Sequence, residues 1–262
     1  MSRQNYYAAR RLRQKRQVDE ALILELVREE RKLQPRIGAR KLLHMYRADF
    51  KDAGIQIGRD RFYEILARND LLVLPKPGRP RTTNSRHSLG VFPNLIKGLE
   101  IKAPNEVWVS DITYLRTEQE FLYLSLIMDA YSRKIVGYHV GDNLESEGCL
   151  MALDMALKGL PEGRRPVHHS DRGCQYCCHR YTERLREQGM AISMTEILHC
   201  YENSKAERLN GILKQEYELD RTFRTKEQVY KAVGQAIGLY NYRRPHLKLN
   251  NRIPATVHQE AA

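Results

Sequence analysis

The sequence lacks any long hydrophobic run. Its longest apolar stretches, at residues 22–24 and 71–74, hold only a few residues each, whereas a membrane-spanning helix needs about 18. The first residues are polar and basic with no apolar segment behind them, so we expect neither a signal peptide nor a membrane anchor. With 42% hydrophobic and 29% charged residues among 262, the composition is that of a globular chain with one large domain or two modest ones.

Cysteine is scarce and odd in number. Three of the five cysteines crowd together at Cys174, Cys177 and Cys178, which argues against a disulfide framework and favours a reducing compartment. Zinc is an alternative, because thiolates and imidazoles are its usual ligands. The candidate ligands would be Cys174, Cys177, Cys178, His179, His199 and Cys200. Since there is only one Cys-x-x-Cys pair, we favour small buried thiols.

Acidic residues are under-represented in the first third of the chain. Residues 1–98 carry 22 lysines and arginines against 10 acidic residues, while residues 99–262 carry 22 of each. The whole excess of +12 therefore lies in one region, which predicts a module that binds a polyanion. The alternative is a solvated surface with an accidental imbalance, at the cost of self-repulsion.

Helical periodicity marks residues 17–31, 38–51 and 59–69, with a break at Gly54 and Gly58. Two helices joined by a glycine-bearing connection, the second with exposed arginines, are typical of a helix-turn-helix. The alternative is an ordinary three-helix bundle with a basic surface. The candidate DNA-binding residues here are Arg40, Arg47, Arg61 and Arg68.

A linker follows at residues 75–90, which contain three prolines and two glycines and show no apolar periodicity. It is basic, and the piece Gly78-Arg79-Pro80 resembles the core of an AT-hook. We interpret Arg79 and Arg81 first as cations that neutralise a nucleic-acid backbone.

The period becomes strand-like after residue 105. Strands are predicted at 106–116, 120–131 and 134–141, and their short connections imply an antiparallel meander. A helix at 145–158, a strand at 165–170, a helix at 179–188 and a strand at 190–195 then imply parallel additions. Helices are predicted at 202–218 and 226–242, the latter opened by a capping box of Thr225 and Gln228. The predicted fold class is α/β, a mixed sheet flanked by helices.

Three acidic residues stand out by their context. Asp111 lies within a strand otherwise built for burial, Asp171 directly follows a strand, and Glu207 lies on a helix 35 residues beyond Asp171. Lys214 is seven residues after Glu207 and so returns to the same helix face. Carboxylates in such a group suit two Mg²⁺ or Mn²⁺ ions about 4 Å apart, which activate the attacking oxygen and stabilise the leaving oxygen of a phosphodiester. A lysine beside them suits a phosphate.

The sequence segments around these residues resemble those of a known family. Asp111, Asp171 and Glu207, with Lys214 at plus seven, are similar to the D,D-x35-E signature of transposases and retroviral integrases. The segments WVSDITY at 108–114, HSDRG at 169–173, AERLNGILKQE at 206–216 and RPH at 244–246 resemble bacterial insertion-sequence transposases of the OrfB type, encoded by the second of two overlapping frames. The resemblance spans about residues 35–258 and departs mainly at Cys174, Cys177, Cys178 and Lys205; none of these removes a metal ligand.

The resemblance implies a ribonuclease-H-like core and two-metal DNA cleavage and strand transfer, with Asp111, Asp171 and Glu207 as catalytic metal ligands. It implies double-stranded DNA as the partner, a homo-oligomer on DNA, possible fusion to an upstream reading-frame product, and a cytoplasmic location at the nucleoid. The expected domains are a helix-turn-helix domain at 1–74, a basic linker at 75–104, a catalytic domain at 105–220, and a C-terminal helix and basic tail at 221–262.

Several roles stay open at this point. A metal-dependent nuclease and a non-catalytic DNA-binding protein are the alternative functions. Lys214 is expected to contact DNA near the joined end, and Arg208 either helps or forms a surface ion pair. The basic cluster of Arg243, Arg244 and His246 either contacts DNA, chiefly through Arg244, or complements a helix C-terminus. His168 and His169 either support the metal site or simply end a strand.

Overall fold

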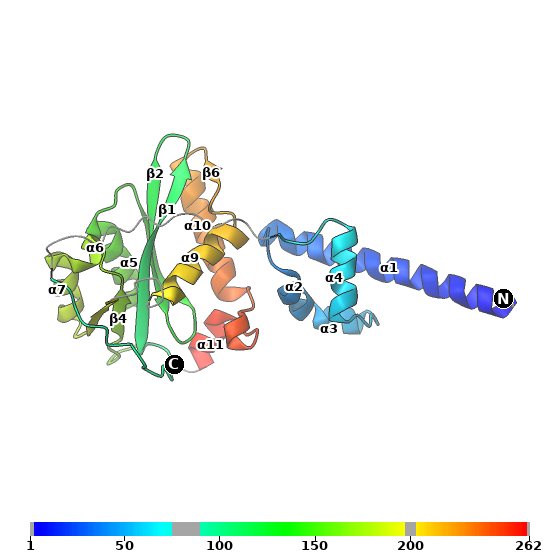
Figure 1. Ribbon diagram of the computed structural model, residues 1–262, viewed down its shortest axis with the longest axis horizontal. Helices are drawn as coiled ribbons and strands as arrows, with labels where there is room; N and C mark the ends of the chain where they lie inside the picture. Colours follow the sequence, from blue (N-terminus) through cyan, green and yellow to red (C-terminus); the bar gives the residue numbers. More distant parts are fainter. Residues whose placement is uncertain (1–2, 75–89, 197–202, 261–262) are drawn as a thin grey trace. The chain divides into compact units, whose positions relative to one another are not determined.

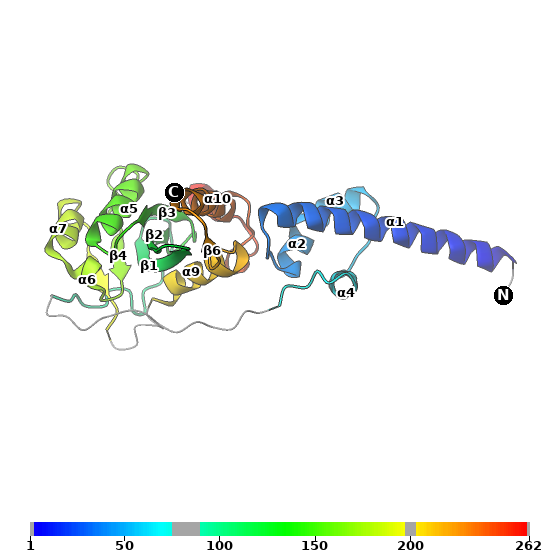
Figure 2. The same cartoon turned by 90° about the horizontal axis from the view of Figure 1, so that it is seen from above.

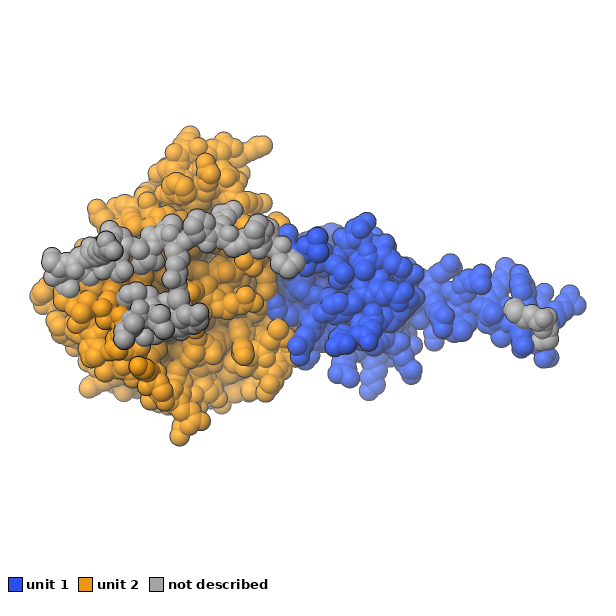
Figure 3. Space-filling model, in the orientation of Figure 1, with its two compact units in different colours: residues 1–76 blue, residues 77–262 orange. Residues whose placement is uncertain are grey.

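The computed structural model describes residues 3–74, 90–196 and 203–260, drawn from two directions in Figure 1 and Figure 2. The chain separates into two compact units, residues 1–76 and 77–262 (Figure 3). Each unit has a core of its own and is described by itself. Among the helices in the described ranges, none is both long enough and apolar enough to cross a membrane.

The first unit is helical. It contains α1 (Arg3–Leu33), α2 (Ala39–Met45), α3 (Arg47–Asp52) and α4 (Arg59–Arg68). Its core comes from apolar side chains spaced three or four apart on these helices: Ile23, Val27, Leu42, Phe50, Phe62, Ile65 and Leu66. The third predicted helix, 59–69, is confirmed as α4, and the second is split into α2 and α3 at Tyr46.

The first predicted helix was placed too late in the chain. The sequence pattern indicated a start at residue 17, whereas α1 begins at Arg3. Residues 3–16 carry no apolar stripe, but they are rich in alanine, arginine, lysine and glutamine, which have high intrinsic helix propensity. Hydrophobic periodicity therefore predicted only the part of α1 that packs against a core.

The second unit is built on a mixed sheet of order β3-β2-β1-β4-β5, with β6 paired to β1. The strands are β1 (Val107–Thr117), β2 (Phe121–Asp129), β3 (Ile135–Gly141), β4 (Val167–Ser170), β5 (Ile192–Met194) and β6 (Thr222–Phe223). The predicted antiparallel meander is β1 to β3, and the predicted parallel additions are β4 and β5. The two-residue strand β6 was not predicted.

Helices cover both faces of this sheet (Figure 2). One face carries α5 (Ser146–Lys158), α6 (Cys174–Cys177) and α7 (His179–Glu187), and the other carries α9 (Ser204–Glu216) and α10 (Lys226–Tyr242). A short 3₁₀ helix (Leu247–Leu249) and α11 (Pro254–Glu260) follow. The predicted capping box is confirmed, because Thr225 Oγ1 accepts the Gln228 N–H at 3.4 Å.

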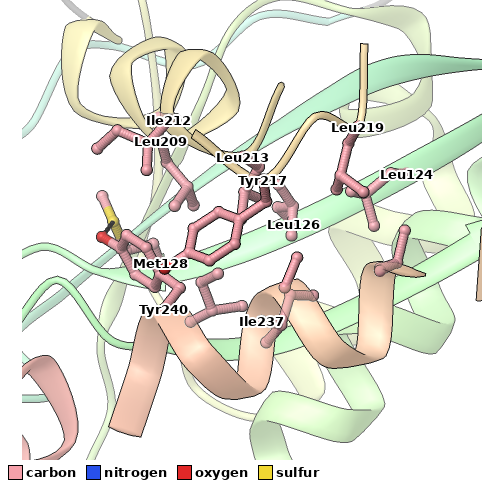
Figure 4. Packing of buried hydrophobic residues seen from close by; sticks show 14 of the residues in the cluster. Leu124, Leu126, Met128, Leu209, Ile212, Leu213, Tyr217, Leu219, Ile237 and Tyr240 are labelled. Carbon is pink, nitrogen blue, oxygen red and sulfur yellow. Dashed lines mark hydrogen bonds between the residues drawn. The ribbon is translucent and has the colours of Figure 1, made fainter. Parts of the chain in front are cut away.

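The two cores follow from strand alternation. Val107, Val109 and Leu115 of β1 point to α9 and α10, whereas Trp108 and Ile112 point to α5 and α7. Figure 4 shows how Leu209 and Leu213 of α9, with Tyr217 directly after the helix, meet Ile237 and Tyr240 of α10 over strand β2. Helix α9 also packs against β1, the strand that carries Asp111.

Segments outside the central sheet also belong to the second unit. Residues 93–95 run beside β5, where the Met194 N–H donates to the Pro93 carbonyl and the Leu95 N–H donates to Ser193 Oγ. At the other end of the chain, Val229, Val233 and Ile237 of α10 complete one of the two cores. The structure thus has the end of the expected linker and the C-terminal helix packed into the unit that holds the sheet.

Candidate active site

The site begins with the register of two neighbouring strands. β1 and β4 run parallel, with Trp108 opposite His168 and Val109 opposite His169. Continuing that register by two residues places Asp111 level with Asp171, which directly follows β4. Adjacent strands lie roughly 4.8 Å apart, so the sheet brings these two carboxylates side by side although 59 residues lie between them in sequence.

Helix α9 brings the third carboxylate over the same strand. Asn203, its N-cap residue, donates from Nδ2 to the Ser110 carbonyl at 3.0 Å, and Asn210 donates from Nδ2 to Asp111 Oδ2 at 2.8 Å. Glu207 lies four residues after the first of these anchors and three before the second, so all three share one helix face. The face that carries Glu207 is thus the one bonded to both Ser110 and Asp111.

The electrostatics agree with this placement. The pKa of Asp111 is raised to about 7, by burial first and then by the negative charges of Asp171 and Glu207, against the lowering effect of hydrogen bonds from the Ile112 N–H and Asn210. Three carboxylates therefore interact at one place. Without a cation, burial and the neighbouring negative charges favour the protonated form of Asp111. A cation bound at the site would favour the ionised form instead.

The donor set fits a hard divalent cation, since carboxylate oxygens are the preferred ligands of Mg²⁺ and Mn²⁺. Asp111 and Asp171 meet on the sheet, and Glu207 faces them from the exposed first turn of α9. Within the described residues, no three His, Cys, Asp or Glu side chains are already assembled closely enough to hold a metal ion. The site thus has the right ligand types, on three separate elements.

A buried polar network ties the strands together beneath the site. Ser110 Oγ and Tyr181 OH lie 2.7 and 2.9 Å from His168 Nε2, and His169 Nδ1 lies 2.9 Å from Ser193 Oγ. Burial lowers the pKa of His168 to about 3, so its ring is neutral. Both histidines are fully buried and therefore cross-link β1, β4, β5 and α7 instead of offering ligands at the surface.

The loop after β4 is held tightly around Asp171. The Gly173 N–H donates to Asp171 Oδ1 at 2.9 Å, and a Cβ at Gly173 would lie 3.0 Å from the same oxygen. Arg172 donates from Nε to the Thr195 carbonyl at 2.6 Å, and Gln175 donates from Nε2 to the Leu144 carbonyl at 2.8 Å. Glycine is the residue that leaves room for the carboxylate here.

The prediction of small buried thiols for the cysteine cluster next to this loop holds for Cys177 and is wrong for Cys174. Cys177 is buried, and burial raises the pKa of its thiol to about 11. Cys178 is half-buried and Cys174 is exposed. His199 and Cys200, which the zinc alternative also needs, lie outside the described residues.

The predicted DNA-binding residues fall into three groups. Lys214 is half-buried on α9, about 10 Å beyond Glu207 along the helix axis, and Arg40 and Arg47 are exposed. Arg61 and Arg68 are exposed but form ion pairs, Arg61 with Glu64 at 2.7 Å and Arg68 with Glu20 at 2.9 Å. Arg79 and Arg81 lie outside the described residues.

Arg244 corrects the interpretation of the C-terminal basic cluster. Its side chain is 3% exposed and forms a bidentate ion pair with Glu216, through Nε at 2.8 Å and a terminal nitrogen at 2.9 Å. The guanidinium also lies 5.6 Å from the centre of the Tyr240 ring. This buried side chain ties the segment directly after α10 to the last residue of α9 and is not available to a DNA backbone.

Some residues of the site were missed as functional candidates. Asn210 and Gly173 donate hydrogen bonds to Asp111 and Asp171. Ser110 bonds to His168, and Asn203 bonds to the Ser110 carbonyl, so both tie the surrounding elements together. All four stand within or beside the sequence segments that resemble transposases. Their nearness in sequence to an acidic candidate was the one feature that could have indicated them. Their contacts join different elements of the fold, so no regular spacing in the sequence predicts these contacts.

Comparison with known proteins agrees with this arrangement. Two family models described as "Integrase core domain" match residues 101–200 and 188–254. The chain is 35% identical over 254 residues to the uncharacterized 31 kDa protein of insertion element IS600 from Shigella sonnei, covering 95% of this chain and 92% of that protein. It is 32% identical over 205 residues to the transposase for insertion sequence IS629 from the same organism, covering 77% and 68%.

A solved structure shares the fold. The chain aligns with a simian T-cell lymphotropic virus intasome, determined in complex with a PP2A regulatory subunit, with a TM-score of 0.50 and 16% identity over 85% of this chain and 70% of that chain. The ribonuclease-H-like core that the family resemblance implies, and with which the strand and helix order agrees, is thereby supported as a fold.

Proposed function

The chain belongs to the family of insertion-sequence transposases with an integrase core domain and is a polynucleotidyl transferase, and from this premise we propose that Asp111, Asp171 and Glu207 form its catalytic centre. The observation that supports the proposal is that the β1–β4 register puts Asp111 level with Asp171, while α9, which carries Glu207, is hydrogen-bonded to Asp111 through Asn210. The pKa of Asp111 is raised by burial first, and then by the charges of Asp171 and Glu207. In this proposal the substrate is double-stranded DNA: the ends of an insertion sequence, and a target.

The proposed reaction has two steps. In the first, water attacks a phosphorus atom at the end of the element, the bond to the 3′ oxygen breaks, and that oxygen leaves as a 3′-hydroxyl. In the second, this hydroxyl attacks a target phosphate and loses its proton, and the target's own 3′ oxygen leaves and is protonated. Two Mg²⁺ or Mn²⁺ ions held by the three carboxylates would supply activation of the attacking oxygen and neutralisation of the leaving one.

The surrounding residues have supporting roles in this proposal. Asn210 orients Asp111, and the Gly173 N–H orients Asp171, each through a hydrogen bond to one carboxylate oxygen. A carboxylate oxygen that accepts one hydrogen bond has a further lone pair with which it can bind a cation. The neutral His168 network holds β1 and β4 in register beneath them, so the carboxylates need little reorganisation when the site is loaded.

The experiment that tests the function is cleavage and joining of labelled element ends by the full chain, with Mg²⁺ and with chelator. We expect cleaved and joined products in Mg²⁺, none in chelator, and recovery when Mg²⁺ is added back in excess. Cleavage without joining would favour the plain nuclease. DNA binding without either product would favour a non-catalytic DNA-binding protein.

Lys214 is proposed to contact a phosphate near the joined end, because it lies two helical turns beyond Glu207 on the same face of α9. We expect Lys214→Ala to reduce joining about tenfold or more at low DNA concentration, with partial recovery at high concentration. Lys214→Arg should retain more activity, since a phosphate contact depends on charge. The measurement is the joining rate as a function of DNA concentration.

Lys231→Ala, which removes an exposed lysine on α10, is the matched control and should join at the wild-type rate. If Lys214 were only a surface lysine paired with Glu218, the pair would contribute about 0.3–0.5 kcal/mol. Lys214→Ala would then join normally at every concentration, which would end the proposal for this residue.

We propose that the chain acts as an oligomer on DNA, alone or fused to an upstream reading-frame product, and in the cytoplasm, where bacterial DNA lies. The family supports this, and the solved structure that shares the fold is itself an intasome.

A further inference from the structure

The first half of α1 extends beyond the other helices of its own unit (Figure 1). All sixteen residues from 3 to 18 are exposed, and the first fully buried side chain of the helix is Ile23. Tyr6 and Tyr7 are 55% and 47% exposed and pack edge to face against each other, with ring centres 5.6 Å apart. This segment, residues 3–18 of α1, is called here the basic arm.

The charge of the basic arm has one sign only. It contains six cations and no acidic residue: Arg3, Arg10, Arg11, Arg13, Lys15 and Arg16. Several of them are three or four residues apart, as Arg10 and Arg13 or Arg11 and Lys15 are, and like charges at these spacings destabilise a helix. Cations near a helix N-terminus also oppose the helix dipole. Residues 3–18 therefore carry a charge that the arm itself does not balance.

The apolar residues of the arm do not form a stripe. Tyr6, Leu12 and Val18 are six residues apart, and at 3.6 residues per turn they point in directions roughly 120° from one another. A coiled coil or a helix packed on an apolar surface needs a continuous stripe at i, i+3 and i+4. The distribution of side chains therefore disfavours a second copy of this chain and favours a partner recognised by charge.

The arginines of α4 are less available for such a partner. Arg68 donates to Glu20 Oε2 at 2.9 Å, and Arg61 pairs with Glu64 at 2.7 Å and approaches Glu20 within 3.8 Å. The pairs with Glu20 hold α4 to α1 just beyond the basic arm. The arm's six cations thus outnumber the two arginines that the helix-turn-helix interpretation places on α4.

We propose that the basic arm is a contact surface for duplex DNA, to which its cations bind through the phosphate backbone. The arm is about 24 Å long, and an α-helix fits the major groove of DNA, where its cations can reach phosphates on both sides. Tyrosine hydroxyls can donate to phosphate oxygens as well. Bound phosphates would balance the like-charge repulsion and so stabilise the arm as a helix. This inference rests on the proposed function, in which the chain acts on DNA.

The test uses the full chain and a variant in which Arg10, Arg11, Arg13 and Arg16 are replaced by Gln, which keeps helix propensity. The matched control also removes four exposed cations, but in the second unit: Lys158, Arg164, Arg224 and Lys231 are replaced by Gln. Binding to a generic labelled duplex is measured between about 50 and 200 mM salt. Each lost phosphate contact lowers the log–log salt slope by about 0.9.

We expect the arm variant to bind more than about tenfold more weakly at low salt, with a slope lower by about two to four, while the control keeps its slope within about one. Thermal unfolding should be unchanged in the arm variant, because none of its substituted side chains is buried. Circular dichroism should show helix gained on DNA addition by the wild type and less by the arm variant.

An arm variant with the wild-type slope would overturn this inference and leave the proposed function standing. An arm variant that binds DNA normally but has lost a dimer in sedimentation would assign the arm to self-association, which also overturns it. A wild-type chain that binds no duplex DNA would overturn both the inference and the proposed function.

Discussion

Asp111→Asn, Asp171→Asn and Glu207→Gln are each expected to reduce DNA cleavage and joining by at least about 100-fold, while DNA binding stays within about twofold of the wild type. Each change removes one of the proposed anionic metal ligands and keeps the side chain's shape. Binding should persist because the excess positive charge of the chain lies in residues 1–98. The measurements are a joining assay in Mg²⁺ and a separate duplex-binding assay.

Unfolding of metal-free protein is the control that excludes damage to the fold. The pKa of Asp111 is raised from 3.8 to about 7 in the folded chain, so the folded state binds more protons than the unfolded state between these values. The free energy of unfolding should therefore fall as pH rises from about 4 to 7. Asp111→Asn has no ionisable carboxyl at this position, so its free energy of unfolding should lack this pH dependence.

At pH 8 in chelator we expect Asp111→Asn to be more stable than the wild type by about 1–3 kcal/mol, since Asp111 is only partly buried and solvent reduces the full effect. The difference should disappear near pH 4. Denaturant titrations at three pH values measure this. Identical pH dependence of the two proteins would remove Asp111 from a crowded carboxylate site, and normal joining by any of the three variants would remove that residue from catalysis.

Arg244→Ala is expected to lower the free energy of unfolding by about 3–5 kcal/mol, because it leaves the mostly buried Glu216 carboxylate without its bidentate partner. The change also removes the contact of the guanidinium with Tyr240. Chemical denaturation at neutral pH measures the loss. For an exposed arginine that only contacted DNA, the expected change would be within about 0.5 kcal/mol.

The neighbouring Arg243→Ala is the matched control, since Arg243 is exposed and its loss should change stability by no more than about 0.5 kcal/mol. Replacing the pair together, Arg244→Met with Glu216→Leu, should recover most of the stability, because apolar residues of similar volume can substitute for a buried ion pair. A stable Arg244→Ala protein with weakened DNA binding would instead return Arg244 to the DNA-binding surface.

Much of the site was predictable from local sequence. Alternation and β-branched residues predicted β1 to β3, and the strand and helix order after residue 145 predicted the parallel additions. The spacing of Asp171, Glu207 and Lys214 carried the family resemblance. Such features depend on the hydrophobic periodicity of one helix or strand, or on a short motif. Both can be recognised from residues that are close together in the sequence.

Other features depended on pairing between distant segments. The β1–β4 register brings Asp111 to Asp171, and packing of α9 on the sheet brings Asn210 to Asp111. Arg243 and Arg244 are adjacent residues of the same type, yet Arg244 is buried and Arg243 is exposed. No local pattern distinguishes these cases, because burial depends on which elements meet in space.

The sequence by itself therefore determined the family, the class of fold and the acidic residues that are proposed to do the chemistry. The tertiary structure decided which side chains hold those residues in place, which arginine is buried, and that the basic first half of α1 lies exposed. The physical reason is that propensity and periodicity act over a few residues. The dielectric surroundings and partners of a charge, in contrast, are set by the whole fold.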